Sequence, residues 1–313
     1  MRVLIAVPCF NEELSIEECI ENIRTATKNL NTDICIFNDG SDDSTPEILE
    51  KCKDIIVLNS KQNIGLSKVF NNIVHFANEN SYDYLIIYDA DNQYPHQEIE
   101  NFLDFAIKNN FDISIGIRNF DKNKIFTKSK NLIQKFGSLF ISLVLGIKVL
   151  DVTSGFRIYS SKSLENIYST NSFSYTIETL FFAKKNKLSI GQFNLISFNK
   201  TRDSRLFSSN FEYINKTFKI LLTSVLLFKN NILFYFYVAM ITPGIVLSSR
   251  FLKDYFTDPN YNGHVQSLIV GMAIFVIATL IYISLVIISL TKNNIVEVEK
   301  ATFRPAYKVI KNI

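Results

Sequence analysis

The chain has 313 residues, of which 47% are hydrophobic and 20% charged, and this composition excludes an intrinsically disordered protein. Its 33 Lys and Arg against 30 Asp and Glu give a formal charge of +3, which is too small to favour nucleic acid as the partner. Ten Gly and six Pro exclude a collagen-like or linker-dominated chain.

Short apolar runs alternate with amphipathic stretches over the first 120 residues. The amphipathic stretches predict helices near residues 15–29, 44–52, 67–79 and 96–108. The apolar runs predict strands at Val3–Val7, which Pro8 ends, and at Ile34–Asn38, Ile55–Asn59, Tyr84–Tyr88 and Ile113–Gly116. This alternation predicts a doubly wound, mainly parallel α/β sheet, in which ligands bind beyond the carboxyl ends of the strands.

The N-terminal region carries no sign of export. The cysteines, Cys9, Cys19, Cys35 and Cys52, show neither C-x-x-C spacing nor histidines at zinc spacing, which indicates buried, reduced thiols. The first apolar run spans only six residues, which is shorter than the core of a secretory signal. We therefore expect the N-terminal region to stay in the cytosol.

Two long uncharged segments follow residue 230. Ile232–Ser249 has 18 residues and Val265–Leu290 has 26, so each is long enough to cross a hydrocarbon core of about 30 Å as a helix. The alternative is a helix buried in a large soluble domain, which seldom runs so long without polar residues. The sequence therefore predicts a two-helix transmembrane hairpin, with a kink at Pro243-Gly244 in the first helix.

Charge placement predicts the orientation of these spans. The connecting loop carries Arg250 and Lys253, whereas the tail carries Lys292, Lys300, Arg304, Lys308 and Lys311. By the positive-inside rule the tail is cytosolic, and an even number of spans puts the N-terminal domain on the same side. We expect four parts: a cytosolic domain over 1–210, a juxtamembrane amphipathic helix over 211–230, two spans with a short loop over 231–290, and a basic cytosolic tail over 291–313. A helix packed on the soluble domain is the alternative for 211–230.

Polar residues follow the second predicted strand. The second strand leads into Asn38-Asp39-Gly40-Ser41-Asp42-Asp43-Ser44, where the oxygens of Asp39, Ser41 and Asp43 can bind ribose hydroxyls and a base edge. Turn formation and helix capping are the alternative. Neither G-x-G-x-x-G nor G-x-x-x-x-G-K-[ST] is present, so other groups must neutralise any bound phosphates.

The fourth strand leads into Asp89-Ala90-Asp91-Asn92-Gln93. Two carboxylates at i and i+2 can bind one hard divalent cation, Mg²⁺ or Mn²⁺, and Gln93 can add a neutral oxygen. A solvated turn is the alternative. The position after a buried strand favours the metal site, because two uncompensated carboxylates there would be costly.

These motifs together resemble family 2 glycosyltransferases of GT-A fold, in the branch of dolichyl-phosphate mannose synthases and bacterial polyprenyl-phosphate glycosyltransferases. The resemblance covers nearly the whole chain. It is carried by Val7-Pro8-Cys9-Phe10-Asn11-Glu12, the Asn38–Ser44 turn, Asn63-Ile64-Gly65-Leu66-Ser67, Asp89-Ala90-Asp91-Asn92-Gln93-Tyr94-Pro95, Gly116-Ile117-Arg118 and Asp151-Val152-Thr153-Ser154-Gly155-Phe156-Arg157, followed by the two spans.

The resemblance implies a role for each matching residue. The nucleotide pocket would be lined by Pro8, Asn11, Glu12, Asp39 and Asp43, and the metal and donor diphosphate would be held by Asp89, Asp91 and Gln93. The catalytic set would comprise Asp89, Asp91, Arg118 and Arg157, with Arg118 facing the acceptor phosphate or the leaving group. Cations for a lipid phosphate would be Lys128, Lys130, Arg202 and Arg205, although an ordinary solvated face is the alternative for both lysines.

Two positions depart from the family pattern. Ser204-Arg205 stands where Ser-Lys is usual, without the preceding glycine, and Asn38 stands where the family often has aspartate. From Lys200 to Lys229 there are six Lys or Arg and two Asp or Glu, a net charge of +4 beside the first span. This patch could attract a polyprenyl phosphate, and a general affinity for acidic headgroups is the alternative.

The resemblance implies transfer of a sugar from a nucleotide-sugar to polyprenyl phosphate at the membrane, with inversion at the anomeric carbon. A UDP-sugar is the preferred donor and a GDP-sugar the alternative. Homo-oligomers are common in the family. A processive polysaccharide synthase is disfavoured because its Q-x-x-R-W motif needs a Trp, which this chain lacks. Transfer to a growing lipid-linked or surface glycan and a non-catalytic nucleotide-sugar-binding scaffold remain the other readings. The retained acidic pair argues against the scaffold.

Overall fold

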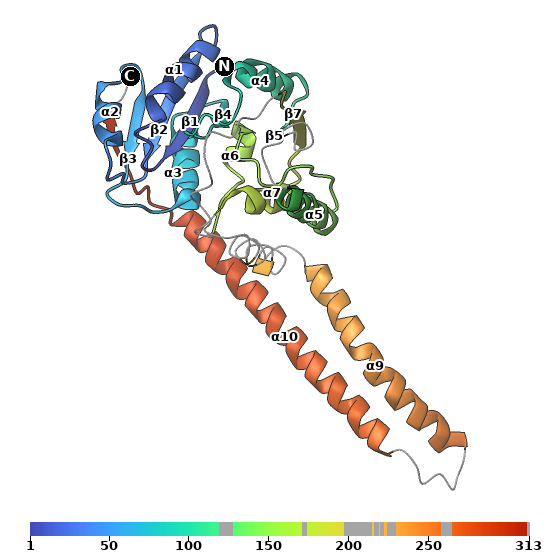
Figure 1. Ribbon diagram of the computed structural model, residues 1–313. Helices are drawn as coiled ribbons and strands as arrows, with labels where there is room; N and C mark the ends of the chain where they lie inside the picture. Colours follow the sequence, from blue (N-terminus) through green and yellow to red (C-terminus); the bar gives the residue numbers. More distant parts are fainter. Residues whose placement is uncertain are drawn as a thin grey trace. The chain divides into compact units, whose positions relative to one another are not determined.

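The structure is a computed structural model that describes residues 1–118, 128–170, 174–196, 230–257 and 265–311, and the single positions 215, 219, 222 and 223. It divides into two compact units (Figure 1). Unit 1 comprises Met1–Ile220 and Arg304–Ile313, and unit 2 comprises Leu221–Phe303. Most of the predicted juxtamembrane helix at 211–230 lies outside the described residues.

Unit 1 is built on one mixed sheet, which has eight strands in the described part of the chain, in the order β7-β5-β6-β4-β1-β2-β3-β8. The strands are β1 (Val3–Cys9), β2 (Thr32–Asn38), β3 (Ile56–Asn59), β4 (Tyr84–Ile87), β5 (Ile113–Ile117), β6 (Arg157–Ser160), β7 (Ile190–Asn194) and β8 (Lys308–Lys311). Strand β1 pairs in parallel with β2 and β4, and β2 with β3, whereas β6 and β8 run antiparallel to their neighbours. The predicted doubly wound, mainly parallel sheet is confirmed.

The first strand is longer than predicted. It continues through Pro8, which pairs with Phe37, and ends at Cys9. The prediction that Pro8 ends the strand is therefore wrong. Since β4 pairs only with Val3–Ala6, Pro8 lies beyond the doubly paired part of β1, where the missing N–H is tolerated.

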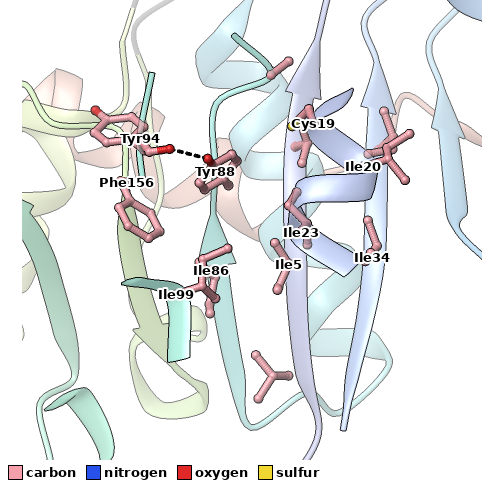
Figure 2. Packing of buried hydrophobic residues seen from close by; sticks show 14 of the residues in the cluster. Ile5, Cys19, Ile20, Ile23, Ile34, Ile86, Tyr88, Tyr94, Ile99 and Phe156 are labelled. Atoms are coloured by element: carbon pink, nitrogen blue, oxygen red, sulfur yellow. Dashed lines mark hydrogen bonds between the residues drawn. The ribbon is translucent and has the colours of Figure 1, made fainter. Parts of the chain in front are cut away.

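Helices cover both faces of the sheet. Alternate residues of β1 and β2, such as Ile5 and Ile34, pack against α1 (Ile16–Ala26), α2 (Thr45–Lys51) and α4 (Ile99–Lys108), which follows the short 3₁₀ helix η1 (His96–Glu98). Figure 2 shows this core, in which Ile20 and Ile23 of α1 lie over the strands. On the other face, Phe70 of α3 (Leu66–Glu79) contacts the rings of Tyr159 in β6 and of Tyr175, which directly precedes α7 (Thr176–Lys185), and α6 (Ser161–Leu164) adjoins α3. Each of these helices buries only one face against the sheet, which explains the amphipathic pattern of apolar residues in the sequence.

The end of the chain returns to the sheet. Strand β8 pairs antiparallel with β3, and the ring of Tyr307 meets Phe37 and Phe76 edge to face, with centroids 6.0 and 6.2 Å away. The backbone N–H of Ala306 donates to the side chain of Asn72 at 2.7 Å. Part of the predicted basic tail is therefore the edge strand of the N-terminal domain.

Replacing Tyr307 with alanine is expected to lower the free energy of unfolding of unit 1 by about 1–3 kcal/mol, because two ring contacts are lost at a half-buried site. Ile310→Ala is the matched control, since Ile310 is exposed on β8, the strand that directly follows Tyr307. Thermal unfolding of the purified full chain measures both variants. Equal midpoints for the two would contradict a packed role for the tail.

The described part of unit 2 contains two long helices, α9 (Asn230–Thr257) and α10 (Val265–Ala301), each long and apolar enough to cross a membrane. They pack closely through small residues: a Cβ on Gly271 would lie 2.7 Å from the Gly244 carbonyl oxygen and 2.4 Å from Ser248 Oγ. Helix α10 has 37 residues and is about 55 Å long, so it extends well beyond a hydrocarbon core of about 30 Å. Both helices are longer than the predicted spans.

Candidate active site

The sheet topology brings the predicted site segments to one edge. The parallel strands β1, β2, β3 and β4 all end there, and so does β5. Strand β6 starts at this edge, because its first residue, Arg157, pairs with Ile87 of β4 and with Ile115 of β5. The loops after β4 and β5 therefore meet the segment before β6. Asp89 and Arg118 lie in these loops, and Asp151 lies in that segment.

The loops after β1 and β2 are tied to each other. Asn11 has a left-handed backbone, with φ 54°, and its N–H donates to Ser41 Oγ at 3.0 Å. The N–H of Glu12 donates to Thr45 Oγ1 at 2.9 Å. Asp43 accepts from the N–H groups of Glu13 and Thr45, and although its burial raises the pKa, these hydrogen bonds outweigh burial and lower it. The structure thus brings together the two segments predicted to bind the nucleotide, which follow β1 and β2. They form one hydrogen-bonded corner of the sheet edge, which includes Pro8 near the end of β1.

Asp39 organises a third loop at the same corner. Its buried carboxylate accepts from the backbone N–H groups of Ile64 and Gly65 at 2.8 and 3.1 Å. Burial raises the pKa of Asp39, and these two hydrogen bonds partly offset the rise. Next to it, Gly40 has φ +70°, and a Cβ there would lie 2.5 Å from the backbone of Gln62, so only glycine fits.

The acidic pair lies on the loop after β4. Asp89 and Asp91 are both partly buried, and Asp91 Oδ1 accepts from the N–H of Gln93 at 3.2 Å. Asn92, which lies between Asp91 and Gln93, has a left-handed backbone with φ 56°. Its side-chain amide donates to the carbonyl oxygen of Ser15, directly before α1, so the loop turns back towards that helix. Hard oxygen donors at this spacing suit a divalent cation. Among the described residues no group of three or more His, Cys, Asp or Glu could hold a metal alone.

Cys19 of α1 lies beneath this loop, with its Sγ 3.9 Å from the carbonyl oxygen of Asp89. Burial raises the pKa of the Cys19 thiol strongly, and the charges of Asp91 and Asp89 raise it further. Burial and the neighbouring carboxylates thus favour the neutral thiol in the metal-free protein.

Gly155 makes room for Asp89. A Cβ on Gly155 would lie 3.0 and 3.1 Å from the two carboxylate oxygens of Asp89, so the carboxylate occupies the space of a side chain. The loop is held by tyrosines: the N–H of Gly155 donates to Tyr94 Oη at 3.0 Å, and Tyr175 Oη donates to the Gly155 carbonyl at 3.1 Å. The segment before β6 thus sets the position of Asp89.

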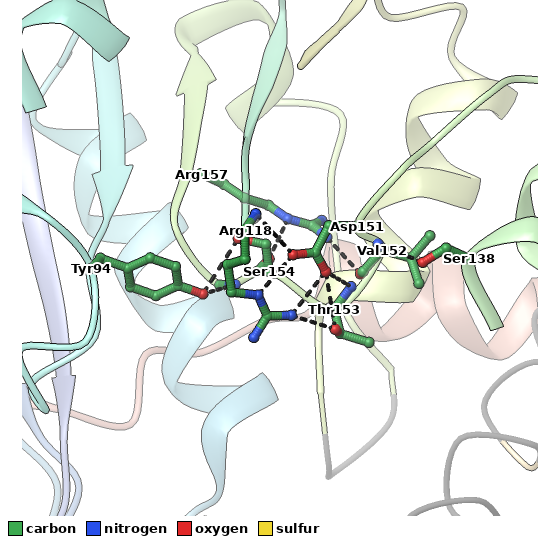
Figure 3. A network of polar contacts seen from close by, with 9 residues as sticks. Tyr94, Arg118, Ser138, Asp151, Val152, Thr153, Ser154 and Arg157 are labelled. Atoms are coloured by element: carbon green, nitrogen blue, oxygen red, sulfur yellow. Dashed lines mark hydrogen bonds and ion pairs between the residues drawn. The ribbon is translucent and has the colours of Figure 1, made fainter. Parts of the chain in front are cut away.

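An ion pair joins the β5 loop to the same segment (Figure 3). Arg118 donates Nε and Nη2 to the two carboxylate oxygens of Asp151 at 2.7 and 2.8 Å, and Nη2 also donates to Thr153 Oγ1 at 2.7 Å. The two side chains are 11% and 2% exposed. Burial alone would raise the pKa of Asp151, but the charge and hydrogen bonds of Arg118 outweigh burial and lower it.

Arg157 differs from its predicted catalytic role. Its side chain is fully buried, and its guanidinium donates to the carbonyls of Val152, Ser154 and Thr176 and to Thr179 Oγ1 at 2.7–2.9 Å. A side chain with no exposed surface and with its donors spent on the framework does not reach a substrate. The structure therefore corrects this assignment: Arg157 is a positioning residue that fixes the segment before β6 to α7.

The predicted acceptor cations are not visible in the same detail. Arg202 and Arg205 lie outside the described residues. Lys128 and Lys130 lie in the first turn of α5 (Lys128–Leu145), where the structure describes the backbone and not the side chains. Their proposed contacts with a lipid phosphate stay predictions.

Sequence reasoning gave no role to two residues that shape this site. Asp151 is the first residue of the Asp151–Arg157 motif. Its position directly before a turn of small residues is the sequence feature that could have indicated a role in the site. Glu178 is buried in α7 and accepts from Ser169 Oγ and from the N–H and hydroxyl of Thr170, so it anchors the loop before α7. No spacing signal in the sequence marked Glu178.

Known proteins share both the sequence pattern and the fold. A family described as "Glycosyl transferase family 2" matches residues 4–168. A UDP-N-acetylglucosamine–dolichyl-phosphate N-acetylglucosaminyltransferase of Methanococcus voltae is 28% identical over 61% of this chain and 83% of its own length. An undecaprenyl-phosphate mannosyltransferase of Micrococcus luteus is 27% identical over 53% of this chain and 70% of its own length. Glucosyl-3-phosphoglycerate synthase from Mycobacterium tuberculosis, solved with Mn²⁺, UDP-glucose and phosphoglyceric acid, aligns with a TM-score of 0.56 and 17% identity over 72% of this chain and 78% of its own, and this likeness concerns the fold.

Proposed function

Because the chain belongs to glycosyl transferase family 2 and has the GT-A fold, we propose that it transfers a sugar from a nucleotide-sugar to polyprenyl phosphate, with inversion at the anomeric carbon. We propose a UDP-sugar as the donor, with a GDP-sugar as the alternative. The names of the two relatives support this acceptor class. The observation that carries the proposal is the meeting of Asp89, Asp91 and the Arg118–Asp151 pair at one sheet edge.

The donor would bind across the corner formed by the first three strands. Pro8, Asn11, Glu12, Asp39, Ser41 and Asp43 are the residues we assign to the nucleotide. Their loops are held to one another by the hydrogen bonds described above, so these residues would need little rearrangement when the donor binds. Residues that are already in place reduce the ordering cost of binding.

The oxygen donors after β4 fit a divalent cation, Mg²⁺ or Mn²⁺. Asp89 and Asp91, with Gln93 beside them, would hold it through oxygen donors. Two carboxylates do not complete a coordination shell, so the remaining ligands would come from the diphosphate. When bound, the cation stabilises the negative charge that develops on the leaving diphosphate.

The acceptor phosphate needs no strong general base, because its oxygen is already ionised near neutral pH. The task of the chain is therefore alignment of two polyanions. Arg118 offers a guanidinium whose direction Asp151 and Thr153 fix through three hydrogen bonds. We assign the positioning of the acceptor phosphate or leaving group to Arg118.

We propose that α9 and α10 span the membrane and that both termini and unit 1 are cytosolic. The pairing of β8 with β3 supports a shared side, because the segment that follows the second helix is part of the sheet in unit 1. The cationic residues of the tail support the cytosolic side. A lipid acceptor with a long isoprenoid tail would then meet the enzyme at the bilayer.

A donor panel tests the proposal. Purified full-length protein in proteoliposomes with polyprenyl phosphate is incubated with radiolabelled UDP- and GDP-sugars, and the lipid is then extracted. We expect one labelled sugar to appear in the lipid phase as an acid-labile polyprenyl product, with release of the nucleoside diphosphate. Label that remains in the aqueous phase with every donor, or that enters only a glycan polymer, would contradict the proposed acceptor.

Gly155→Ala is expected to reduce kcat roughly 10–100-fold while the protein stays folded, because the added Cβ would press on both oxygens of Asp89. Gly137→Ala is the matched control, since nothing lies within 4 Å of a Cβ there. Steady-state kinetics at saturating Mn²⁺ and circular dichroism measure the two effects. Unchanged kcat for Gly155→Ala would show that the carboxylate position beside Gly155 does not matter for transfer.

A further inference from the structure

Helix α5 (Figure 1) carries large apolar side chains that are exposed to solvent on one of its faces. Phe136, Leu139, Phe140 and Leu143 recur at positions i, i+3, i+4 and i+7, which places them on one side of the helix. They are 62%, 56%, 52% and 72% exposed. Large apolar side chains gathered in this way mark a surface that contacts something.

The opposite face of α5 fixes which side is exposed. Ile141 and Leu145 are buried against unit 1, and Ser142 Oγ accepts from the N–H of Val149 at 2.9 Å in the loop that follows the helix. Ser138 Oγ accepts from the N–H of Val152 at 3.4 Å. The helix therefore cannot roll its apolar face inwards without breaking its own packing.

The net charge of the sequence in and around α5 favours one kind of partner. Residues 122–150 contain six Lys and no Asp or Glu. Lys135 on α5 and Lys148 just after it are exposed, and the other lysines are Lys122, Lys124, Lys128 and Lys130. A second copy of the chain would bring like charges together, whereas an anionic lipid surface is complementary to a basic, apolar helix.

We propose that α5 is a membrane-docking helix, whose face of Phe136, Leu139, Phe140 and Leu143 inserts into an anionic leaflet. Its most apolar part, Gln134–Leu145, is too short to span a bilayer, so the helix would lie in the interface. The bilayer is always within reach of unit 1, because the same chain continues into two helices able to cross it.

Docking would also act on the site. Helix α5 connects β5 to the segment before β6, so it lies in the chain between Arg118 and Asp151. Ser138 is bonded to Val152, whose carbonyl accepts from Arg157 Nη2 at 2.8 Å. This consequence rests on the proposed function: seating α5 on lipid would hold the Asp151–Gly155 segment at a fixed height over the headgroups, where an acceptor phosphate lies.

The chain lacks Trp, so one introduced Trp reports a single position without background. Phe140→Trp and Leu143→Trp are compared with Ile310→Trp, which is 58% exposed on β8. Each full-length variant is reconstituted in vesicles of phosphatidylcholine and phosphatidylglycerol, with brominated acyl chains as quencher. We expect blue-shifted emission and at least roughly twofold stronger quenching at 140 and 143 than at 310, with the difference reduced in phosphatidylcholine alone.

Equal quenching at all three positions would overturn the docking proposal. Emission that shifts with the protein-to-lipid ratio, without quenching by brominated lipid, would instead identify a second copy as the occupant. Quenching does not depend on turnover, so this result stands apart from the proposed reaction. In the transfer assay, the double variant Phe140→Asn with Leu143→Asn should raise KM for long-chain polyprenyl phosphate about fivefold or more and leave KM for a short water-soluble acceptor unchanged, whereas Ile310→Asn should change neither.

Discussion

Asp91→Ala is expected to abolish metal-dependent transfer, with a loss of about 1,000-fold or more in kcat/KM. A loss of that size corresponds to about 4 kcal/mol of transition-state stabilisation, which is what a cation at a leaving diphosphate supplies. The side chain accepts the Gln93 N–H at 3.2 Å from a partly buried loop, so its removal should leave the fold intact. Nucleoside diphosphate release and lipid-phase label measure the effect.

Two controls separate chemistry from charge and folding. Asp104→Ala removes an acid that is paired with Lys108 on the exposed face of α4, and it should leave transfer within about twofold of wild type. Asp91→Asn keeps the size of the side chain and loses its charge, so it should be nearly as inactive as Asp91→Ala. Undiminished turnover in either Asp91 variant would remove the metal site from the account.

Asp151→Asn is expected to lower the free energy of unfolding by about 3–5 kcal/mol, because Arg118 would keep a mostly buried charge without its partner. Transfer should fall about 100-fold as the guanidinium loses its fixed direction. Chemical unfolding and acceptor-dependent kinetics measure the two losses. If the pair acts as a unit, Arg118→Met combined with Asp151→Asn should cost less than the sum of the single changes.

The pH dependence of that variant tests the same ion pair. Arg118 holds the pKa of Asp151 below its ordinary value despite burial, so the pair stabilises the fold above about pH 4, where an unfolded Asp is ionised, and loses this contribution as pH falls through the folded pKa. The stability gap between wild type and Asp151→Asn should therefore be constant from pH 5 to 8 and shrink in acid. A gap that widens on acidification would contradict the ion pair.

The sheet and the acidic loop were predictable from sequence because their signals are local. Strands such as β4 read as short apolar runs between turn residues, and the topology rule then puts the following Asp89 and Asp91 at the ligand-binding edge. Membrane-length segments are equally local, although α10 continues to Ala301, past the last apolar residue predicted. One sequence is enough to predict such elements, because the spacing of the apolar residues and the length of each apolar run identify them.

Long-range partners explain what sequence patterns missed. Arg157 looks catalytic in its motif, and its burial follows only once α7 supplies the Thr176 carbonyl and the Thr179 hydroxyl. Asp151 gains its role from Arg118, which is 33 residues away. Strand β8 is four residues long, and the sequence pattern indicated only a basic tail there. Its partner β3 lies near the start of the chain, so all of unit 2 separates the two strands in the sequence. Pairings of that separation leave no periodic trace.

Direct titration of the metal is the sharpest test of the central claim, that Asp89 and Asp91 hold a divalent cation together with the donor diphosphate. Electron paramagnetic resonance follows free Mn²⁺ as the full-length protein is added with UDP or GDP, and Asp104→Ala serves as the control. We predict that wild type and Asp104→Ala bind one Mn²⁺ only when the matching nucleotide is present, and that Asp89→Ala and Asp91→Ala do not. Equal Mn²⁺ and nucleotide binding by the wild type and both acidic-pair variants would contradict it.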